Sequence, residues 1–126
     1  MLNVKKTLTK LLGVVGSCSY SLSEVNTGTT WVDGKSIYKK TLRYNNTTLA
    51  NNTTINHGIS NIYRVVKIEA HIDDNGYHLA FPTTANGSPN DLGIRVTATQ
   101  IQFVGNDSWG AGATRYIYVT LYYTKS

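Results

Sequence analysis

The side chains best suited to recognise a ligand lie in two polar loops, residues 82–91 and 105–113. Trp109 stands in the second loop among glycines and small polar residues. A displayed aromatic ring with amide, carboxylate and hydroxyl neighbours suits carbohydrate, because the ring stacks on a sugar face while the polar groups hold hydroxyls. The alternative is that Trp109 plugs one end of the fold or packs against a neighbouring subunit. The candidate binding residues are Asn86, Asn90, Asn106, Asp107, Ser108 and Trp109.

Catalytic chemistry has weak support in the sequence. The chain has seven acidic residues, and several stand in turn contexts where Asp bonds to the local backbone. Asp73 and Asp74 are adjacent, and neighbouring residues of a strand point to opposite faces, so they do not form a catalytic pair. The sequence contains neither a glycine-rich phosphate loop before a helix nor a Gly-x-Ser-x-Gly elbow. We therefore predict no enzyme activity and no cofactor.

The histidines do not have the spacing of a metal site. His71 and His78 flank a turn over residues 73–76 and are placed to face each other across a hairpin. Two ligands leave a zinc site incomplete, so a shared site would need copies of the chain to meet at a symmetry axis. We predict no metal site within one chain.

Composition narrows the class of protein. The 126 residues suffice for one domain, and 40% of them are hydrophobic. The net charge is +5, but the basic residues are scattered, whereas a nucleic-acid footprint would be a clustered stripe. No stretch reaches the roughly 20 apolar residues that a membrane span needs. Cys18 is the only cysteine, so no disulfide forms within the chain.

The element that must position the loops is a C-terminal strand over residues 115–124. Its residues alternate with the period of two that is typical of a strand, and most are β-branched or aromatic. The face that can enter a core carries Ile117, Val119, Leu121 and Tyr123. The opposite face carries Tyr116, Tyr118, Thr120 and Tyr122.

Further strands precede it. We expect strands over residues 29–32, 36–44, 62–72, 77–81, 92–99 and 100–104, with short fragments at best within residues 45–58. In the third of these, simple alternation places one set of residues on a single face: Ile62, Arg64, Val66, Ile68, Ala70 and Ile72. About seven or eight strands without an intervening helix predict an all-β antiparallel sandwich, jelly-roll-like in character.

The N-terminus has a different pattern. Residues 3–16 predict a short helix, in which Val4, Leu8, Leu11 and Val15 have the spacing of a coiled-coil seam. Two heptads are too short to be stable alone in water. The helix is expected either to lie on its own domain or to bundle with copies of itself. We divide the chain into residues 1–20, for oligomerisation or docking, and residues 21–126, the sandwich.

Two segments resemble a known family. Residues 28–41, Gly-Thr-Thr-Trp-Val-Asp-Gly-Lys-Ser-Ile-Tyr-Lys-Lys-Thr, resemble the T-W-I-D-G-K-P-I-Y-R-K-T segment of distal domains in bacteriophage tail-fibre and receptor-binding proteins. The ending, residues 113–125, resembles that family's A-Y-V-T-L-E-Y-T-K close, and residues 57–62 resemble its middle. The likeness spans about residues 20–126 in order. Ser36 stands where the family has Pro, and Tyr63 where an acid is common.

The resemblance implies a virion protein, a homotrimer whose β-sandwich head attaches to a glycan or protein of the host surface. In that setting Tyr116, Tyr118 and Tyr122 are expected at the subunit interface, and the two polar loops at the receptor. The alternative is a capsid-decorating or head-fibre protein whose N-terminal helix docks on the shell. An enzyme acting on cell-wall polysaccharide is disfavoured, because no carboxylate pair is placed for it.

Overall fold

The computed structural model describes residues 19–45, 50–74, 76–81, 92–105 and 115–126, and these ranges contain strands and turns but no helix. The strands are β1 (Val25–Thr30), β2 (Ser36–Asn45), β3 (Thr54–Asn56), β4 (Ile62–Asp74), β5 (Tyr77–Ala80), β6 (Leu92–Val96), β7 (Gln100–Gly105) and β8 (Arg115–Lys125). All their pairings are antiparallel. The expectation of an antiparallel all-β fold is confirmed.

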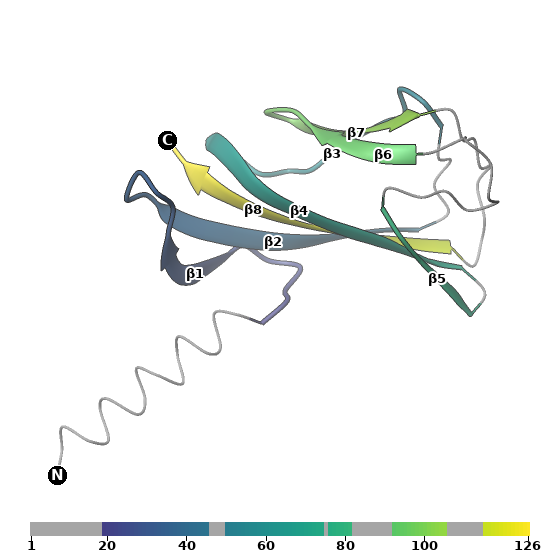
Figure 1. The fold of residues 1–126 in the computed structure, drawn as a ribbon, viewed down its shortest axis with the longest axis horizontal. Helices are drawn as coiled ribbons and strands as arrows, with labels where there is room; N and C mark the ends of the chain where they lie inside the picture. Colours follow the sequence, from purple (N-terminus) through teal and green to yellow (C-terminus); the bar gives the residue numbers. More distant parts are fainter. Residues whose placement is uncertain (1–18, 46–49, 75, 82–91, 106–114) are drawn as a thin grey trace, which may run out of the picture.

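The strands form two sheets, drawn as two layers in Figure 1. The large sheet has the order β1-β2-β8-β4-β5, and the small sheet has the order β3-β7-β6. β8 lies between β2 and β4, so the C-terminal strand is central in the large sheet. A central position satisfies the backbone of this long strand on both sides, which removes the exposed edge that it would otherwise present.

The core lies between the two sheets. From β8, Ile117, Val119, Leu121 and Tyr123 are all fully buried, as their alternation predicted. They pack with side chains from both layers: Leu42, Ile59, Ile72, Leu92, Ile101 and Phe103. The period of two therefore identified the core-facing side of β8 correctly.

The first hairpin departs from its expected bounds. Its turn is closed by backbone bonds from Trp31 N to Lys35 O and from Gly34 N to Trp31 O, each 2.9 Å long. Gly34 takes φ +84°, a left-handed conformation that favours glycine. The expected strand over residues 29–32 is wrong at its end, because the turn takes Val32 out of the ladder and leaves it 90% exposed.

The expected face of β4 is also wrong in part. The register against β8 shifts between Ile62 and Arg64 and again between Val65 and Lys67. Each shift is a bulge, which adds a residue to one strand and reverses the alternation beyond it. As a result Val65 packs against the core, whereas Arg64 and Val66 do not share that face.

The side chain of His57 has a structural role in the segment over residues 57–62. Its ring is buried, with Nδ1 accepting from Ile59 N at 3.1 Å and Nε2 within 3.0 Å of Thr97 O. A neutral ring with its proton on Nε2 satisfies both contacts. His57 thereby joins the connection after β3 to the turn between β6 and β7.

Several expected features lie outside the described residues. They include the helix over residues 3–16 with Val4, Leu8, Leu11 and Val15, and the candidate binding residues Asn86, Asn90, Asn106, Asp107, Ser108 and Trp109. Over the ranges that are described, no helix is long and apolar enough to cross a membrane.

Candidate functional site

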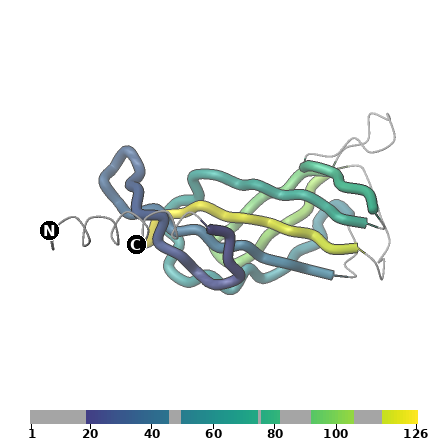
Figure 2. Tube along the Cα trace, turned by 90° about the horizontal axis from the view of Figure 1, so that it is seen from below, coloured from purple at the N-terminus to yellow at the C-terminus, as the bar shows by residue number. Residues whose placement is uncertain are grey.

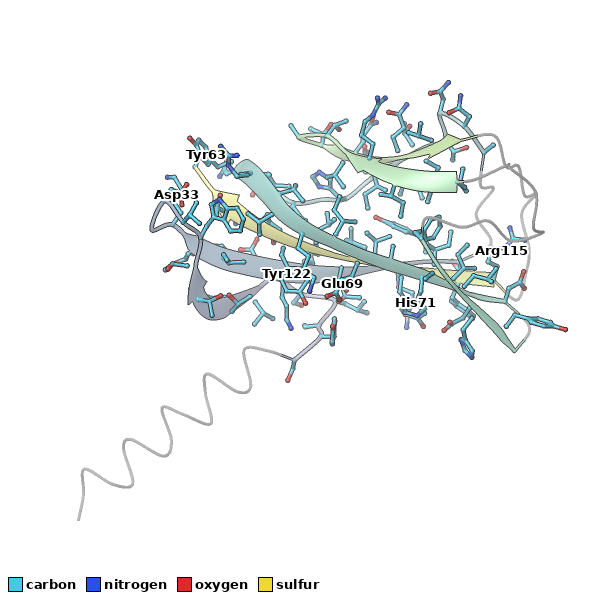
Figure 3. The ribbon with its side chains drawn as sticks, viewed as in Figure 1. Asp33, Tyr63, Glu69, His71, Arg115 and Tyr122 are labelled. Atoms are coloured by element: carbon cyan, nitrogen blue, oxygen red, sulfur yellow. The ribbon has the colours of Figure 1, made fainter. Side chains whose placement is uncertain are left out.

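The large sheet has one face turned away from the small sheet, and we call it the outer face. Figure 3 shows Tyr122, Glu69 and His71 on this side. The register of β2, β8 and β4 places their outer side chains in rows across the sheet. These rows are Lys39–Tyr122–Lys67, Thr41–Thr120–Glu69, Arg43–Tyr118–His71 and Asn45–Tyr116–Asp73.

Residues 19–24, which we call the strap, run along the outer face before β1 begins. In Figure 2, which looks onto this face, the strap is the purple start of the described chain. Its backbone is held by a 2.8 Å hydrogen bond from Thr41 N to Ser21 O. The side chain of Tyr20 crosses β8 and donates its hydroxyl to Glu69 Oε2 on β4 at 3.0 Å. The strap therefore covers part of the row that Tyr116, Tyr118 and Tyr122 form on the outer face, which we call the tyrosine stripe.

Under the strap, lysines and tyrosines alternate. Lys39 is only 3% exposed, and its Nζ lies 4.5 Å from the ring centroid of Tyr20 and 5.8 Å from that of Tyr122. On the other side of Tyr122, the Nζ of Lys67 lies 5.2 Å from the same ring. These distances fit cation–π contacts, which are stronger where water is excluded.

Contacts within this cluster shift the pKa values of Lys67, Glu69 and Tyr122. Lys67 Nζ lies 2.7 Å from Glu69 Oε1, and this bond, more than any other contact, raises the pKa of Lys67 and lowers that of Glu69. The pKa of Tyr122 is raised, first by burial and then by its hydrogen bond with Tyr20. At neutral pH charged Lys67 and Glu69 therefore lie beside a neutral Tyr122.

A second contact anchors the far end of the strap. Glu24 accepts hydrogen bonds from the Tyr123 hydroxyl at 2.7 Å and from Lys125 Nζ at 2.8 Å. Partial burial alone would raise the pKa of Glu24, but the bonds from Lys125 and Tyr123 outweigh it and lower the pKa. Tyr123 is a fully buried core residue. The carboxylate of Glu24 thus ties the strap to the core.

Tyr20 separates two hollows on the outer face. The Trp31 hollow has a volume of 440 Å³ and is lined mainly by Tyr20, Trp31, Lys39, Lys67 and Tyr122. The Tyr118 hollow has a volume of 360 Å³, and its lining includes Tyr20, Glu69, His71 and Tyr118. Both volumes fall within the roughly 300–1,000 Å³ range of small-molecule sites.

The other end of the outer face, which we call the hairpin end, lies beside the β4–β5 turn. Asp73 Oδ1 is 2.6 Å from His78 Nδ1 and 3.5 Å from His71 Nε2. The two histidines thus converge across the hairpin as expected. Asp74 points elsewhere and pairs with Arg115 at 3.3 Å, so the two adjacent aspartates do face apart. Within the described ranges, no group of three or more His, Cys, Asp or Glu side chains could hold a metal ion.

The structure brings together some of the predicted site residues. Tyr116, Tyr118 and Tyr122 share the outer face, as the alternation of β8 predicted. Tyr116 is 40% exposed in the single chain. Whether a second subunit covers these tyrosines stays a prediction.

Sequence reasoning missed the residues that surround Tyr122. Trp31 and Lys39 lie within the segment that carries the family resemblance, which was a usable signal. Lys67 and Glu69 stand two residues apart on β4, a spacing that puts them on one face but indicates no partner. Nothing in the sequence indicated that Tyr20, at the end of the segment over residues 1–20, would contact the sheet.

The chain was compared with known proteins in three ways. No protein-family model, no curated protein and no solved structure matches it.

Proposed function

We propose that this protein is a virion protein of a bacteriophage, the trimeric tail-fibre or receptor-binding head that attaches the particle to the host surface. The observation that carries the proposal is the ordered resemblance over residues 20–126. Its first and last segments, far apart in sequence, lie side by side as β2 and β8. The segments with the likeness therefore belong to one folded unit.

The fold is consistent with such a head. Pairing of the strands is nested, because β2 pairs with β8 and β3 pairs with β7. This nesting supports a jelly-roll-like sandwich, while β4–β5 and β6–β7 pair as simple hairpins. Small all-β heads of this kind present side chains on a rigid scaffold, which suits attachment.

The proposed trimer interface centres on the hairpin end of the outer face. Tyr122 is already covered within its own chain by Tyr20 and two lysines. Tyr116 is 40% exposed and Tyr77 on β5 is 74% exposed, whereas Tyr118 stacks on His71 with 5.1 Å between the ring centroids. Aromatic side chains of this kind are enriched where subunits meet.

Light scattering of the purified protein tests the assembly. We expect a trimer, and we expect Tyr116→Asp with Tyr118→Asp to reduce it to monomers. Tyr63→Asp replaces a ring that is 54% exposed with a charge at the opposite end of β4, away from the proposed interface, and serves as the control that should stay trimeric. A wild-type monomer would refute the trimer.

Immunogold electron microscopy of virions tests the attachment role. Label at the tail tip supports the proposal, and absence of label from the particle refutes it. Label on the capsid would favour the alternative, a decorating protein docked through residues 1–16. The seam-like spacing of Val4, Leu8, Leu11 and Val15 is the observation behind that alternative.

A further inference from the structure

The Trp31 hollow combines aromatic rings with positive charge, and it lies outside the two loops expected to bind the receptor. We infer that it binds an acidic saccharide unit, a sugar that carries a carboxylate or a phosphate. This inference rests on the proposed function, since it names the chemistry of a surface ligand and where that ligand binds.

The rings of the hollow come from three separate parts of the chain. Tyr20 lies in the strap, Trp31 in the turn between β1 and β2, and Tyr122 on the central strand β8. Trp and Tyr rings offer an apolar face and a polar edge, which suits a sugar ring with its C–H face and its hydroxyl rim. At 440 Å³ the hollow is large enough for a small ligand but not for a folded partner.

The charge of the hollow favours an anion. Lys39 and Lys67 line it, and none of the described residues in its lining is acidic. Glu69, just outside, pairs with Lys67 at 2.7 Å. The Lys67 side chain is 59% exposed and has hydrogen-bonding capacity left for a ligand.

Lys39 acts differently from Lys67. It is buried between the rings of Tyr20 and Tyr122 and therefore contributes a fixed positive charge beneath the hollow. A charge in such surroundings is screened less than an exposed one, so its field reaches the ligand more strongly. The net charge of +5 on the whole chain would also favour encounter with an acidic polymer.

The neighbouring hollow provides an internal comparison. The Tyr118 hollow has Glu69 in its lining and no lysine among the described lining residues. A carboxylate there repels an anion. An acidic ligand therefore belongs in the Trp31 hollow, whose lining also includes Thr29.

Calorimetric titration of the full chain tests this inference. The probes are a short oligogalacturonate, a phosphorylated maltooligosaccharide, the same maltooligosaccharide without phosphate and a single-stranded thymidine oligonucleotide. We expect one or both of the first two to bind and the neutral sugar not to bind. Lys67→Gln and Trp31→Ala should each raise the Kd roughly tenfold, the loss expected for a charged hydrogen bond or a stacked ring.

The matched control is Arg95→Gln. Arg95 is an exposed cation on β6 of the small sheet, so this change removes one charge far from the hollow and should leave the Kd within about twofold. Thermal melting checks that each variant folds. Lys67→Gln alters only an exposed side chain and keeps the test valid if Trp31→Ala unfolds.

Several outcomes would overturn the inference. They are equal losses in Lys67→Gln and Arg95→Gln, equal binding of the neutral sugar, no binding of either acidic saccharide, or tighter binding of the oligonucleotide. None of these outcomes changes where immunogold label falls on virions. The ligand of the hollow and the attachment function can therefore fail separately.

Discussion

The two ends of the outer face use the same strand and the same type of residue in different ways. At the strap end, Tyr122 lies between Lys39 and Lys67 and near Tyr20, with Glu24 holding the strap down. At the hairpin end, Tyr116 is 40% exposed and lies opposite Asp73, which contacts His71 and His78. The difference shows that alternation along β8 defines a face but does not say what covers it. One end is covered by its own chain, whereas Tyr116 at the other end is exposed in the single chain.

The largest expected effect comes from truncating Tyr122, which is compared with the same truncation of Tyr116. Tyr122→Ala should lower the free energy of unfolding by about 3 kcal/mol, because a packed ring and its contacts with two lysines are lost. Tyr116→Ala should cost only about 0.5 kcal/mol at protein concentrations too low for subunits to assemble, as for an exposed side chain. Urea unfolding under these dilute conditions measures both. Equal losses there would show that the chain itself covers both tyrosines alike and would contradict the comparison.

Removing the carboxylate of Glu24 should have the next largest effect. Glu24→Ala leaves the buried Tyr123 hydroxyl without its acceptor and should cost about 2 kcal/mol. The double variant Glu24→Ala with Tyr123→Phe should recover part of that loss, since the unpaired hydroxyl is gone. At the hairpin end, Asp73→Ala should cost no more than about 0.5 kcal/mol, because its contacts with histidines are exposed. If Asp73→Ala were as damaging as Glu24→Ala, the ranking of the two ends would be wrong.

The strap end should also give the protein a dependence on acid pH. The pKa values of Glu24 and Glu69 are both lowered in the folded chain. The folded state therefore binds fewer protons than the unfolded state, and stability rises with pH in this range. Their contribution is complete above the unfolded pKa of about 4.3 and is lost as the pH falls through the folded values. Melting temperatures from neutral pH down to acid should fall less steeply for Glu24→Gln with Glu69→Gln than for the wild type. An unchanged slope would mean that these two carboxylates are not held as described.

The smallest expected effect concerns a single hydroxyl. Tyr20→Phe removes the 3.0 Å bond to Glu69 but keeps the ring over Lys39, so it should cost about 0.5 kcal/mol. Tyr77→Phe removes a hydroxyl from an exposed ring and should leave stability unchanged. If Tyr20→Phe lowered the free energy of unfolding as much as Tyr20→Ala, the hydrogen bond to Glu69, and not the ring, would hold the strap on the sheet.

Local sequence patterns predicted much of the fold. Strong alternation placed β8 and its buried residues, and the gap between the strands expected over residues 29–32 and 36–44 contains most of the first turn. The bulges in β4 escaped prediction, because a bulge depends on how a strand fits its neighbour and leaves no periodic trace. Within the candidate site, the sequence predicted that Tyr116, Tyr118 and Tyr122 lie on the same face of the C-terminal strand. The contacts made by Tyr20, Trp31 and Lys67 were not, since each joins residues far apart along the chain.

By itself the sequence determined which residues could enter a core, that the fold would be built of antiparallel strands, and that Tyr116, Tyr118 and Tyr122 would share a face. Those properties follow from side-chain size and a period of two, which act over neighbouring residues. Only the tertiary structure decided that Tyr20 lies over Lys39, that Glu24 ties the strap to Tyr123, and that Trp31 meets Tyr122 in one hollow. Such contacts depend on register and strand order, and these are fixed by the packing of the whole molecule.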